Sequence, residues 1–429
     1  MSLRENARVS IYDELAWRDL IAQSTDLEDL KAAGTLTLYC GFDPTAPSLH
    51  LGNLAQILTV RRFQMHGHFP LALVGGATGL IGDPKASGER SLNPVAVVDE
   101  WVARIRAQLE RFYDFDGANA ARMVNNYDWT KDVNVLEFLR DIGKHFSVNR
   151  MLDREAVAAR LAKDGISYTE FSYQLLQSFD FLELFRRYDC KLQTGGSDQW
   201  GNITAGVDLI RRVEGAQAHA LTTPLLTKAD GTKFGKTESG TIWLDSELTS
   251  PYAFYQFWMN ADDRDVPKLL KTYSFADRNT IDDLIAKTES EPHLRAGQRH
   301  LAQELTTLVH GEDARLGVEA AAKALFGQGE ISELPLSVLS AALQEAPHGS
   351  VESTEVIDGA LPSVDELFVR AGLAKSKGEA RRTVNEGGAY VNNVRVEDPA
   401  HQPSTSDLLG GEWLLLRRGK RNIGGVRLS

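Results

Sequence analysis

The apolar run FPLALVGG, residues 69–76, is the feature that most limits the folds open to this chain. It is far shorter than the roughly 18 residues of a membrane helix, and its closing glycines are typical of a buried parallel strand. A strand-like alternation at residues 34–40 precedes it, and a helical pattern after Asn53 separates the two. This βαβ unit predicts an open α/β sheet that binds its ligand at the carboxyl ends of the strands.

The chain of 429 residues is too long for one ordinary domain. We predict an α/β protein in which a Rossmann-like parallel-sheet domain precedes a helical domain and a small α+β domain. The segment before the small domain mixes Pro, Gly, Ser and acidic residues, which is typical of a linker. The predicted spans are 1–249 for the sheet domain, 250–343 for the helical domain, 344–360 for the linker and 361–429 for the small domain.

Charge is distributed unevenly along the chain. Residues 361–429 carry 11 Lys and Arg against 8 Asp and Glu, whereas the remainder carries 36 against 51, which gives the net charge of −12. A basic tail on an acidic body indicates a phosphate-bearing partner for the tail, although a solvated charged helix is the alternative. The basic residues of its helical part are Arg370, Lys375, Lys377, Arg381 and Arg382.

The compartment is predicted from the cysteines and the N-terminus. Cys40 and Cys190 are the only cysteines, so the sequence offers neither a disulfide framework nor a four-ligand zinc site. The opening MSLRENARVSIYDEL has no apolar core and no small-residue cleavage site. We therefore expect a cytoplasmic enzyme with no dedicated metal site and no membrane partner.

The stretch CGFDPTAPSLHLGNL, residues 40–54, places His50 and Gly52 where a loop becomes a helix. A glycine admits the ligand to the backbone, a helix N-terminus offers free N–H groups, and an imidazole donates a hydrogen bond. The Thr45 hydroxyl can donate to the same oxygens. This combination predicts a phosphate site; a capped helix start with an incidental histidine is the alternative.

The stretch KFGKT, residues 233–237, places two lysines on a glycine-hinged loop. Lys233 and Lys236 can swing onto a triphosphate and neutralise charge as it moves to the leaving group, with Thr237 beside them. By itself such a loop is more often a solvated basic turn.

The stretch FSYQLLQSFDF, residues 171–181, carries a polar stripe on an otherwise apolar helix. Tyr173, Gln177 and Asp180 are spaced i, i+4 and i+7, so they share one helical face. Buried polar groups must be satisfied, and a polar ligand is one way to satisfy them. The alternative is a helix with scattered surface polar residues.

The order and separation of HLGN and KFGKT resemble the HIGH and KMSKS signatures of the class I aminoacyl-tRNA synthetases. The fuller stretches GFDPTAPSLHLGN, GGATGLIGDP, FSYQLLQSFDF, GGSDQWGNI and KFGKT resemble the bacterial tyrosyl-tRNA synthetase family in particular, from about residue 10 to the C-terminus. The resemblance implies a tyrosine–tRNA ligase that activates L-tyrosine with ATP. It also implies a catalytic sheet domain with a helical dimerisation insertion, a helical anticodon-region domain and a small RNA-binding domain.

The resemblance assigns roles to individual residues. The catalytic group it implies comprises Thr45, His50, Lys233, Lys236 and Thr237. The tyrosine ammonium falls to Asp83, Tyr173 and Gln177, and the phenolic hydroxyl to Asp180 and Tyr39. ATP falls to Asp43, Gly52, Asn53, Gly196, Asp198 and Lys236, with Gln193 and Gln199 lining the same cleft. A pocket that requires the hydroxyl rejects phenylalanine without editing, for which tyrosyl-tRNA synthetases are themselves the established example.

Two departures from the family pattern stand in the sequence. Asn53 occupies the place of the second histidine of HIGH, so it can donate a hydrogen bond but carries no charge. The segment after GDP is one residue shorter than usual, so the resemblance extends to Arg90 but not to Lys85.

The resemblance further implies Mg²⁺ brought with ATP, tRNA(Tyr) as partner and a homodimer whose subunits share the tRNA. A tryptophanyl-type synthetase is a close alternative, against which Asp180 and the attached RNA-binding domain argue. A non-catalytic RNA-binding protein on a synthetase scaffold is another, against which His50, Lys233 and Lys236 argue.

Overall fold

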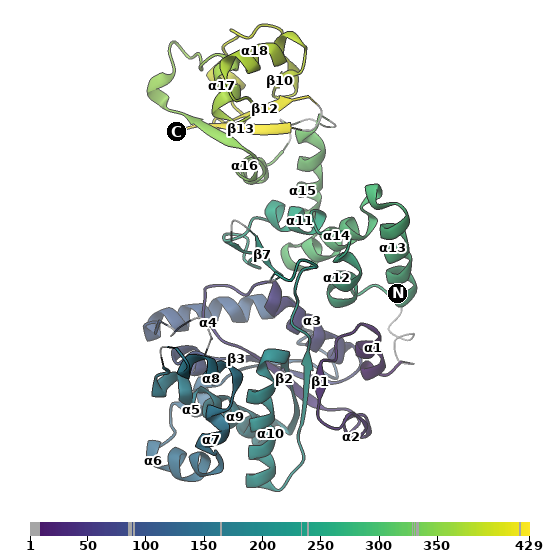
Figure 1. The fold of residues 1–429 in the computed structure, drawn as a ribbon, viewed down its shortest axis with the longest axis vertical. Coiled ribbons are helices and arrows are strands. Elements are labelled where there is room, and N and C mark those ends of the chain that lie inside the picture. The colour runs from purple at the N-terminus through teal and green to yellow at the C-terminus, as the bar shows by residue number, and fades with distance from the viewer. Residues whose placement is uncertain are drawn as a thin grey trace. The chain divides into compact units, whose positions relative to one another are not determined.

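A computed structural model gives the fold of the chain (Figure 1). It describes residues 9–84, 88, 91–163, 165–232, 234–237, 240–327, 329, 331, 334–419 and 422–429. The chain divides into two compact units. Unit 1 comprises Met1–Asp245 and Asp262–Pro292, and unit 2 comprises Ser246–Ala261 and His293–Ser429.

Unit 1 is built on a sheet with the strand order β1-β6-β5-β2-β3-β4. Its strands are β1 (Gln23–Ser24), β2 (Thr37–Phe42), β3 (Phe69–Val74), β4 (Arg122–Asn125), β5 (Cys190–Gly196) and β6 (His219–Thr223). Strands β2 to β6 pair in parallel, and β1 joins β6 in the antiparallel sense. The predicted Rossmann-like parallel sheet is therefore confirmed.

Helices cover both faces of this sheet. Successive residues of a strand point to opposite faces, and β2 illustrates this: Leu38 packs in a core with residues of α1 and α3, whereas Tyr39 packs with residues of α9 and α10. The helices of unit 1 are α1 (Ile11–Trp17), α2 (Leu27–Ala32), α3 (Leu51–Met65), α4 (Val95–Leu109), α5 (Tyr127–Thr130), α6 (Val135–Glu137), α7 (Val148–Leu152), α8 (Glu155–Leu161), α9 (Tyr168–Tyr188), α10 (Trp200–Glu214), α12 (Val266–Tyr273) and α13 (Arg278–Ser290). In the described parts of the chain, no helix combines the length and apolar character needed to cross a bilayer.

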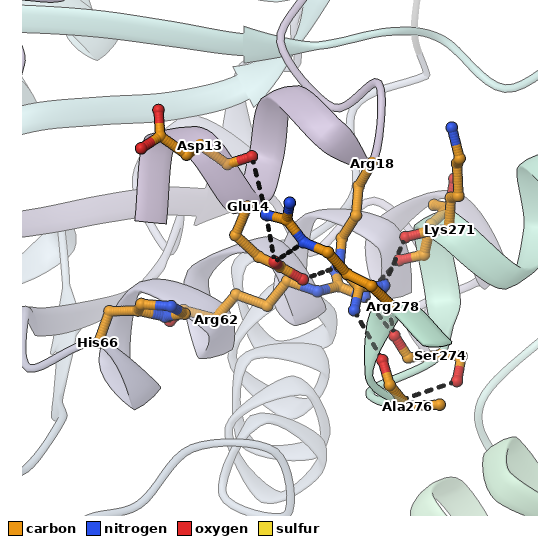
Figure 2. A network of polar contacts seen from close by, with 10 residues as sticks. Asp13, Glu14, Arg18, Arg62, His66, Lys271, Ser274, Ala276 and Arg278 are labelled. Atoms are coloured by element: carbon orange, nitrogen blue, oxygen red, sulfur yellow. Dashed lines mark hydrogen bonds and ion pairs between the residues drawn. The ribbon is translucent and has the colours of Figure 1, made fainter. Parts of the chain in front are cut away.

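Buried arginines hold α12 and α13 against the N-terminal helices (Figure 2). The Arg18 guanidinium donates to the carbonyls of Lys271, Ser274 and Ala276 at 3.0, 2.9 and 3.0 Å, and its Nε donates to Glu14 at 2.7 Å. The three carbonyls lie in the last turn of α12 and on the segment that leads to α13, so separating these helices from α1 would leave the buried guanidinium without these acceptors.

The stretch 250–343, predicted to be one helical domain, does not form a single compact unit. The segment 262–292 belongs to unit 1, while α11 (Pro251–Met259), α14 (Ala296–His310), α15 (Glu312–Leu325) and α16 (Leu336–Glu345) belong to unit 2. Arg62 of α3 adds to the network by donating to the carbonyls of Thr272 and Ser274 at 2.8 and 3.0 Å. The helical stretch is thus divided between the units.

Unit 2 ends in an α+β domain with the strand order β11-β10-β12-β13-β9. Its elements are β9 (His348–Val351), α17 (Val364–Arg370), α18 (Lys377–Asn385), β10 (Ala389–Val391), β11 (Val394–Arg395), β12 (Trp413–Arg418) and β13 (Asn422–Leu428). The segment 344–360 was predicted to be a linker, but its strand β9 pairs in parallel with β13. This part of the chain therefore contributes to the folded C-terminal domain.

Candidate active site

The cavity at the carboxyl ends of β2 and β5 gathers most of the predicted site residues. Its volume is about 390 Å³. It lies where β2 has β3 on one side and β5 on the other, which is the switch point at which open α/β sheets bind ligands. The predicted residues that line it are Tyr39, Asp43, Thr45, His50, Gly52, Asn53, Asp83, Tyr173, Gln177, Asp180, Gln193, Gly196, Asp198 and Gln199.

Asp180 provides a buried carboxylate at one end of the cavity. It projects from α9 and is 2% exposed. The Trp129 indole Nε1 donates to its Oδ1 at 2.8 Å, and the Asn126 amide donates to its Oδ2 at 2.9 Å. Burial raises the pKa of Asp180 to about 7, and these two donors act in the opposite direction by favouring the charged form.

The hydroxyl of Tyr39 faces the same end without a partner. Tyr39 is fully buried on β2, and its hydroxyl has no hydrogen-bond partner among the described residues. Burial, and then the nearby charge of Asp180, raise the pKa of Tyr39 well above its usual value, so the phenol remains protonated. An unpaired buried hydroxyl is costly, and a ligand hydroxyl beside Asp180 would satisfy it.

A chain of hydrogen bonds runs from Asp180 along the cavity wall and returns to Tyr173 on the same helix, α9. Asn126 also donates to the hydroxyl of Thr78 at 2.9 Å, and Thr78 donates to Oδ1 of Asp43 at 2.6 Å. The hydroxyl of Tyr173 donates to the other oxygen of Asp43 at 2.6 Å. Both oxygens of Asp43 thus accept hydroxyl groups of the cavity wall, and Asp43 also lines the cavity in which it is predicted to reach the nucleotide.

Sequence reasoning missed the residues that support Asp180. Asn126 and Trp129 follow β4, and Thr78 follows β3, each as a single polar or aromatic side chain after a strand end. The carboxyl ends of parallel strands meet at one edge of a sheet, so the stretch NYDWT after a strand-like run was the available signal.

A second carboxylate, Asp83, lies among amide groups. Its oxygens accept from Gln199 Nε2 at 3.0 Å and from Asn202 Nδ2 at 3.1 Å. Tyr173 and Gln177, one helical turn apart on α9, line the same cavity. This part of the cavity therefore presents oxygen acceptors suited to a cationic group.

His50 caps the N-terminus of α3 and thereby fixes its own ring. Its Nδ1 accepts the backbone N–H groups of Gly52 at 3.1 Å and Asn53 at 3.3 Å. Because Nδ1 acts as the acceptor, the hydrogen-bond pattern assigns the proton of the neutral ring to Nε2. A Cβ on Gly52 would lie 3.0 Å from the imidazole Cε1, so the glycine leaves room for the ring.

Asn53 has a structural role that its place in HLGN did not reveal. Its Oδ1 accepts the backbone N–H of His50 at 3.0 Å, which completes a capping box at the start of α3. Its NH₂ group remains the donating end of the side chain, and Asn53 lines the cavity.

Main-chain hydrogen bonds join the HLGN turn to the KFGKT loop. Ile242 donates its N–H to the carbonyl of Gly235 at 3.0 Å and accepts from Leu51 at 3.3 Å. Leu244 donates to the carbonyl of Leu49 at 2.8 Å, and β7 (Lys236–Thr237) pairs with β8 (Gly240–Thr241). Lys233, Lys85 and Arg90 lie outside the described residues, as do the side chains of Lys236 and Thr237.

Ion pairs occupy part of the basic surface of the C-terminal domain. Three of the five basic side chains predicted to meet phosphate pair with acidic neighbours, namely Arg370, Lys377 and Arg381. In the described residues Lys375 and Arg382 have no such ion pair. Fewer basic side chains of this surface are therefore left for contact with phosphate than the sequence indicates.

Comparison with known proteins gives the relationship of the chain. The family model "tRNA synthetases class I (W and Y)" matches residues 31–327, and "Tyrosine--tRNA ligase SYY-like C-terminal domain" matches residues 344–424. The tyrosine–tRNA ligase of Streptomyces avermitilis is 61% identical over 425 residues, which cover 98% of this chain and 99% of the relative. That of Thermobifida fusca is 57% identical over 431 residues, with coverage of 97% and 99%.

Solved structures agree with these matches. A C-terminally truncated mitochondrial tyrosyl-tRNA synthetase of Aspergillus nidulans has a TM-score of 0.67 at 29% identity and covers 75% of this chain and 96% of its own. A Plasmodium falciparum tryptophanyl-tRNA synthetase shares the fold, with a TM-score of 0.52 at 13% identity and coverage of 70% and 84%. The chain therefore belongs to the class I tRNA synthetases of the tryptophan and tyrosine type, and within them to the tyrosine–tRNA ligase family.

Proposed function

We propose that the chain activates L-tyrosine with ATP and transfers it to the 3′-terminal adenosine of tRNA(Tyr). In the first step a tyrosine carboxylate oxygen bonds to the α-phosphorus of ATP, the bond to the bridging oxygen breaks, and pyrophosphate leaves. In the second step a ribose hydroxyl attacks the carbonyl of tyrosyl-adenylate and releases AMP. The close relatives named tyrosine–tRNA ligase support this assignment.

The placement of the Asp180 carboxylate and the unpartnered Tyr39 hydroxyl on one cavity is the observation that carries the proposal. A substrate phenol beside them would donate to the Asp180 carboxylate as a third donor and would accept from the Tyr39 hydroxyl, which otherwise has no partner among the described residues. Phenylalanine in the same place would leave the Tyr39 hydroxyl unpaired and would give Asp180 no donor beyond Trp129 and Asn126. Asp83, Tyr173 and Gln177 would hold the ammonium group at the other end of the amino acid.

The remaining groups act by positioning and by charge. The Nε2–H of His50 would donate to an ATP phosphate oxygen, together with Thr45, Asn53 and the lysines of KFGKT. The carboxylate of tyrosine is already a nucleophile, so no general base is needed, and the rate is gained by alignment and phosphate stabilisation. Gly196 and Asp198 would border the nucleoside. Mg²⁺ would arrive bound to ATP; in the described residues no group of three or more His, Cys, Asp and Glu is placed to hold a metal.

A homodimer acting in the cytoplasm completes the proposal. In the segment from α6 to the first residue of α9, apolar side chains are exposed, including Val135 at 66%, Leu136 at 73% and Tyr168 at 71%. Large exposed apolar side chains are candidates for a protein interface, and a second copy of the chain is the partner we propose for them. The basic helices α17 and α18 would contact the tRNA backbone.

ATP–pyrophosphate exchange with each of the twenty amino acids tests the proposed activity. We expect exchange with tyrosine and far slower exchange with phenylalanine or tryptophan, followed by charging of tRNA(Tyr) on addition of the RNA. Exchange with tryptophan would favour the tryptophanyl alternative, and the absence of exchange with every amino acid would favour a non-catalytic scaffold.

A further inference from the structure

Arg154 lies behind the candidate active site rather than in it. It immediately precedes α8 and borders a separate cavity of about 770 Å³. Its guanidinium rests on the first turn of α10, because a Cβ built on Gly201 would fall 2.6 Å from Nη2 and 3.0 Å from Nε. A side chain at position 201 would therefore displace the guanidinium.

The guanidinium of Arg154 reaches the active-site cavity through one amide. Its Nη1 donates to Oδ1 of Asn202. The Nδ2 of Asn202 donates in turn to Oδ1 of Asp83 at 3.1 Å and to Oε1 of Gln199 at 3.0 Å. Gln199 Nε2 closes the group by donating to the other oxygen of Asp83 at 3.0 Å.

This arrangement fixes which end of the Asn202 amide faces Asp83. A guanidinium has only donors, so it requires the carbonyl oxygen of Asn202. The NH₂ end is then left for the carboxylate. Without Arg154 the amide can turn over, and its oxygen would face the Asp83 carboxylate and repel it. The positive charge of Arg154 also polarises the amide and strengthens the bond that Asn202 donates.

The positive charge of Arg154 interacts with the negative charge of Asp83. Burial lowers the pKa of the Arg154 guanidinium, and the carboxylate of Asp83 opposes that effect. Arginine remains charged in proteins, so the side chain places a permanent cation one amide away from Asp83.

We propose that Arg154 is a positioning residue for recognition of the amino-acid ammonium group, and that it acts by locking Asn202 so that Asp83 is held in its acceptor geometry. The inference rests on the proposed role of Asp83 as an ammonium-binding carboxylate. Arg154 does not line the active-site cavity, so its removal should weaken only ligands that carry the ammonium.

Two probes separate this effect from a general loss of structure. Tyramine carries the phenol and the ammonium, whereas 3-(4-hydroxyphenyl)propionate carries the phenol without the ammonium. In calorimetric titrations Arg154→Met should weaken tyramine about tenfold, as expected for the loss of one coupled interaction of roughly 1.4 kcal/mol. The affinity for 3-(4-hydroxyphenyl)propionate should be unchanged.

Matched variants complete the test. Arg150→Met removes a cation that borders the same cavity and, in the described residues, has no hydrogen bond to Asn202; it should leave both affinities unchanged. Arg154→Lys retains a cationic donor and should lose less tyramine affinity than Arg154→Met. Combining Arg154→Met with Asn202→Ala should add little to either single loss.

The result that overturns the inference is distinct from one that overturns the proposed site. If Asp83→Asn weakens tyramine selectively but Arg154→Met does not, Arg154 has no positioning role. Equal weakening of both probes by Arg154→Met also refutes that role, since it shows a general structural effect. If Asp83→Asn leaves tyramine unaffected, the ammonium site itself is misassigned.

Discussion

The indole nitrogen of Trp129 lies 2.8 Å from the carboxylate of Asp180, at the buried end of the active-site cavity. This hydrogen bond links the segment after β4 to the middle of α9. It favours the ionised form of a carboxyl whose burial favours the neutral form. The charge state of Asp180 therefore depends on Trp129, which does not itself line the cavity.

Trp129→Phe should raise the pKa of Asp180 further, because it removes a donor to the charged form. The pH at which tyrosine affinity reaches half its maximum should move upward, by about one unit if the bond contributes roughly 1.4 kcal/mol. Titrations with tyrosine across the pH range measure this shift. Trp101→Phe, on α4 and outside the cavity lining, is the matched control and should leave the midpoint in place.

Tyrosine binding by the unaltered protein should itself depend on pH. Asp180 has a pKa of about 7 in place of an ordinary 3.8, so it is ionised above and protonated below that value. Because hydrogen bonds to a carboxylate are stronger, tyrosine should bind more weakly as the pH falls from about 8 to about 6. The affinity for phenylalanine, which has no hydroxyl, should vary less. Identical pH profiles for the two amino acids would rule out this role.

The same group should affect stability with a predictable sign. The folded state retains the Asp180 proton up to about pH 7, whereas the unfolded state releases it near 3.8. Stability from this group is therefore present at low pH and is lost as the pH rises through the folded pKa. Relative to Asp180→Ala, the free energy of unfolding should therefore decline as the pH rises from 3.8 to about 7. Chemical denaturation at a series of pH values measures the difference.

Lys236→Ala should slow adenylate formation on the order of 100-fold while leaving the Kd for tyrosine nearly unchanged, since the lysine acts on transition-state phosphates. Single-turnover kinetics and equilibrium dialysis give the two quantities. Lys228→Ala, earlier in the same loop and outside KFGKT, should affect neither. Equal losses in binding and rate for Lys236→Ala would contradict the assigned role.

Deleting residues 346–429 should spare tyrosyl-adenylate formation and impair transfer to tRNA. The active-site cavity is lined by residues of unit 1, and the deletion begins just before β9. Loss of the basic helices should raise the KM for tRNA and reduce the salt dependence of charging. Unimpaired charging by the folded truncated protein would refute the role of the C-terminal domain.

A second truncation provides a structural control. A deletion that begins at residue 361 leaves β9 without its partner β13, so it exposes an unpaired strand edge. That variant should aggregate more readily than the shorter one, although their adenylate formation should be alike. Light scattering compares the two.

Much of the site could be predicted because its signals are local. The run at residues 69–76 predicted a buried parallel strand, and the spacing of Tyr173, Gln177 and Asp180 predicted one polar helical face. A helix or strand period places such residues without knowledge of the rest of the fold. His50 was likewise visible as a helix-start residue, and it caps α3.

The missed features depend on contacts between distant segments. Asn126, Trp129 and Asn202 are single side chains that acquire a role only when separate strand ends meet. Arg18 satisfies its donors on carbonyls more than 250 residues away in the chain, which no local pattern reveals. The strand β9 lies in a stretch whose Pro, Gly, Ser and acidic content resembles a linker, and its pairing with β13 outweighs that local preference.

The selection of tyrosine by Asp180 is tested most directly by the ratio of kcat/KM for tyrosine to that for phenylalanine. Pyrophosphate exchange measures this ratio in the unaltered protein and in Asp180→Ala. The substitution should lower the tyrosine value roughly 10- to 100-fold, as expected for losing a hydrogen bond to a charged group, while the phenylalanine value should change much less. The preference for tyrosine should therefore collapse. If Asp180→Ala retains both the tyrosine rate and the preference of the unaltered protein, the buried carboxylate does not select the substrate.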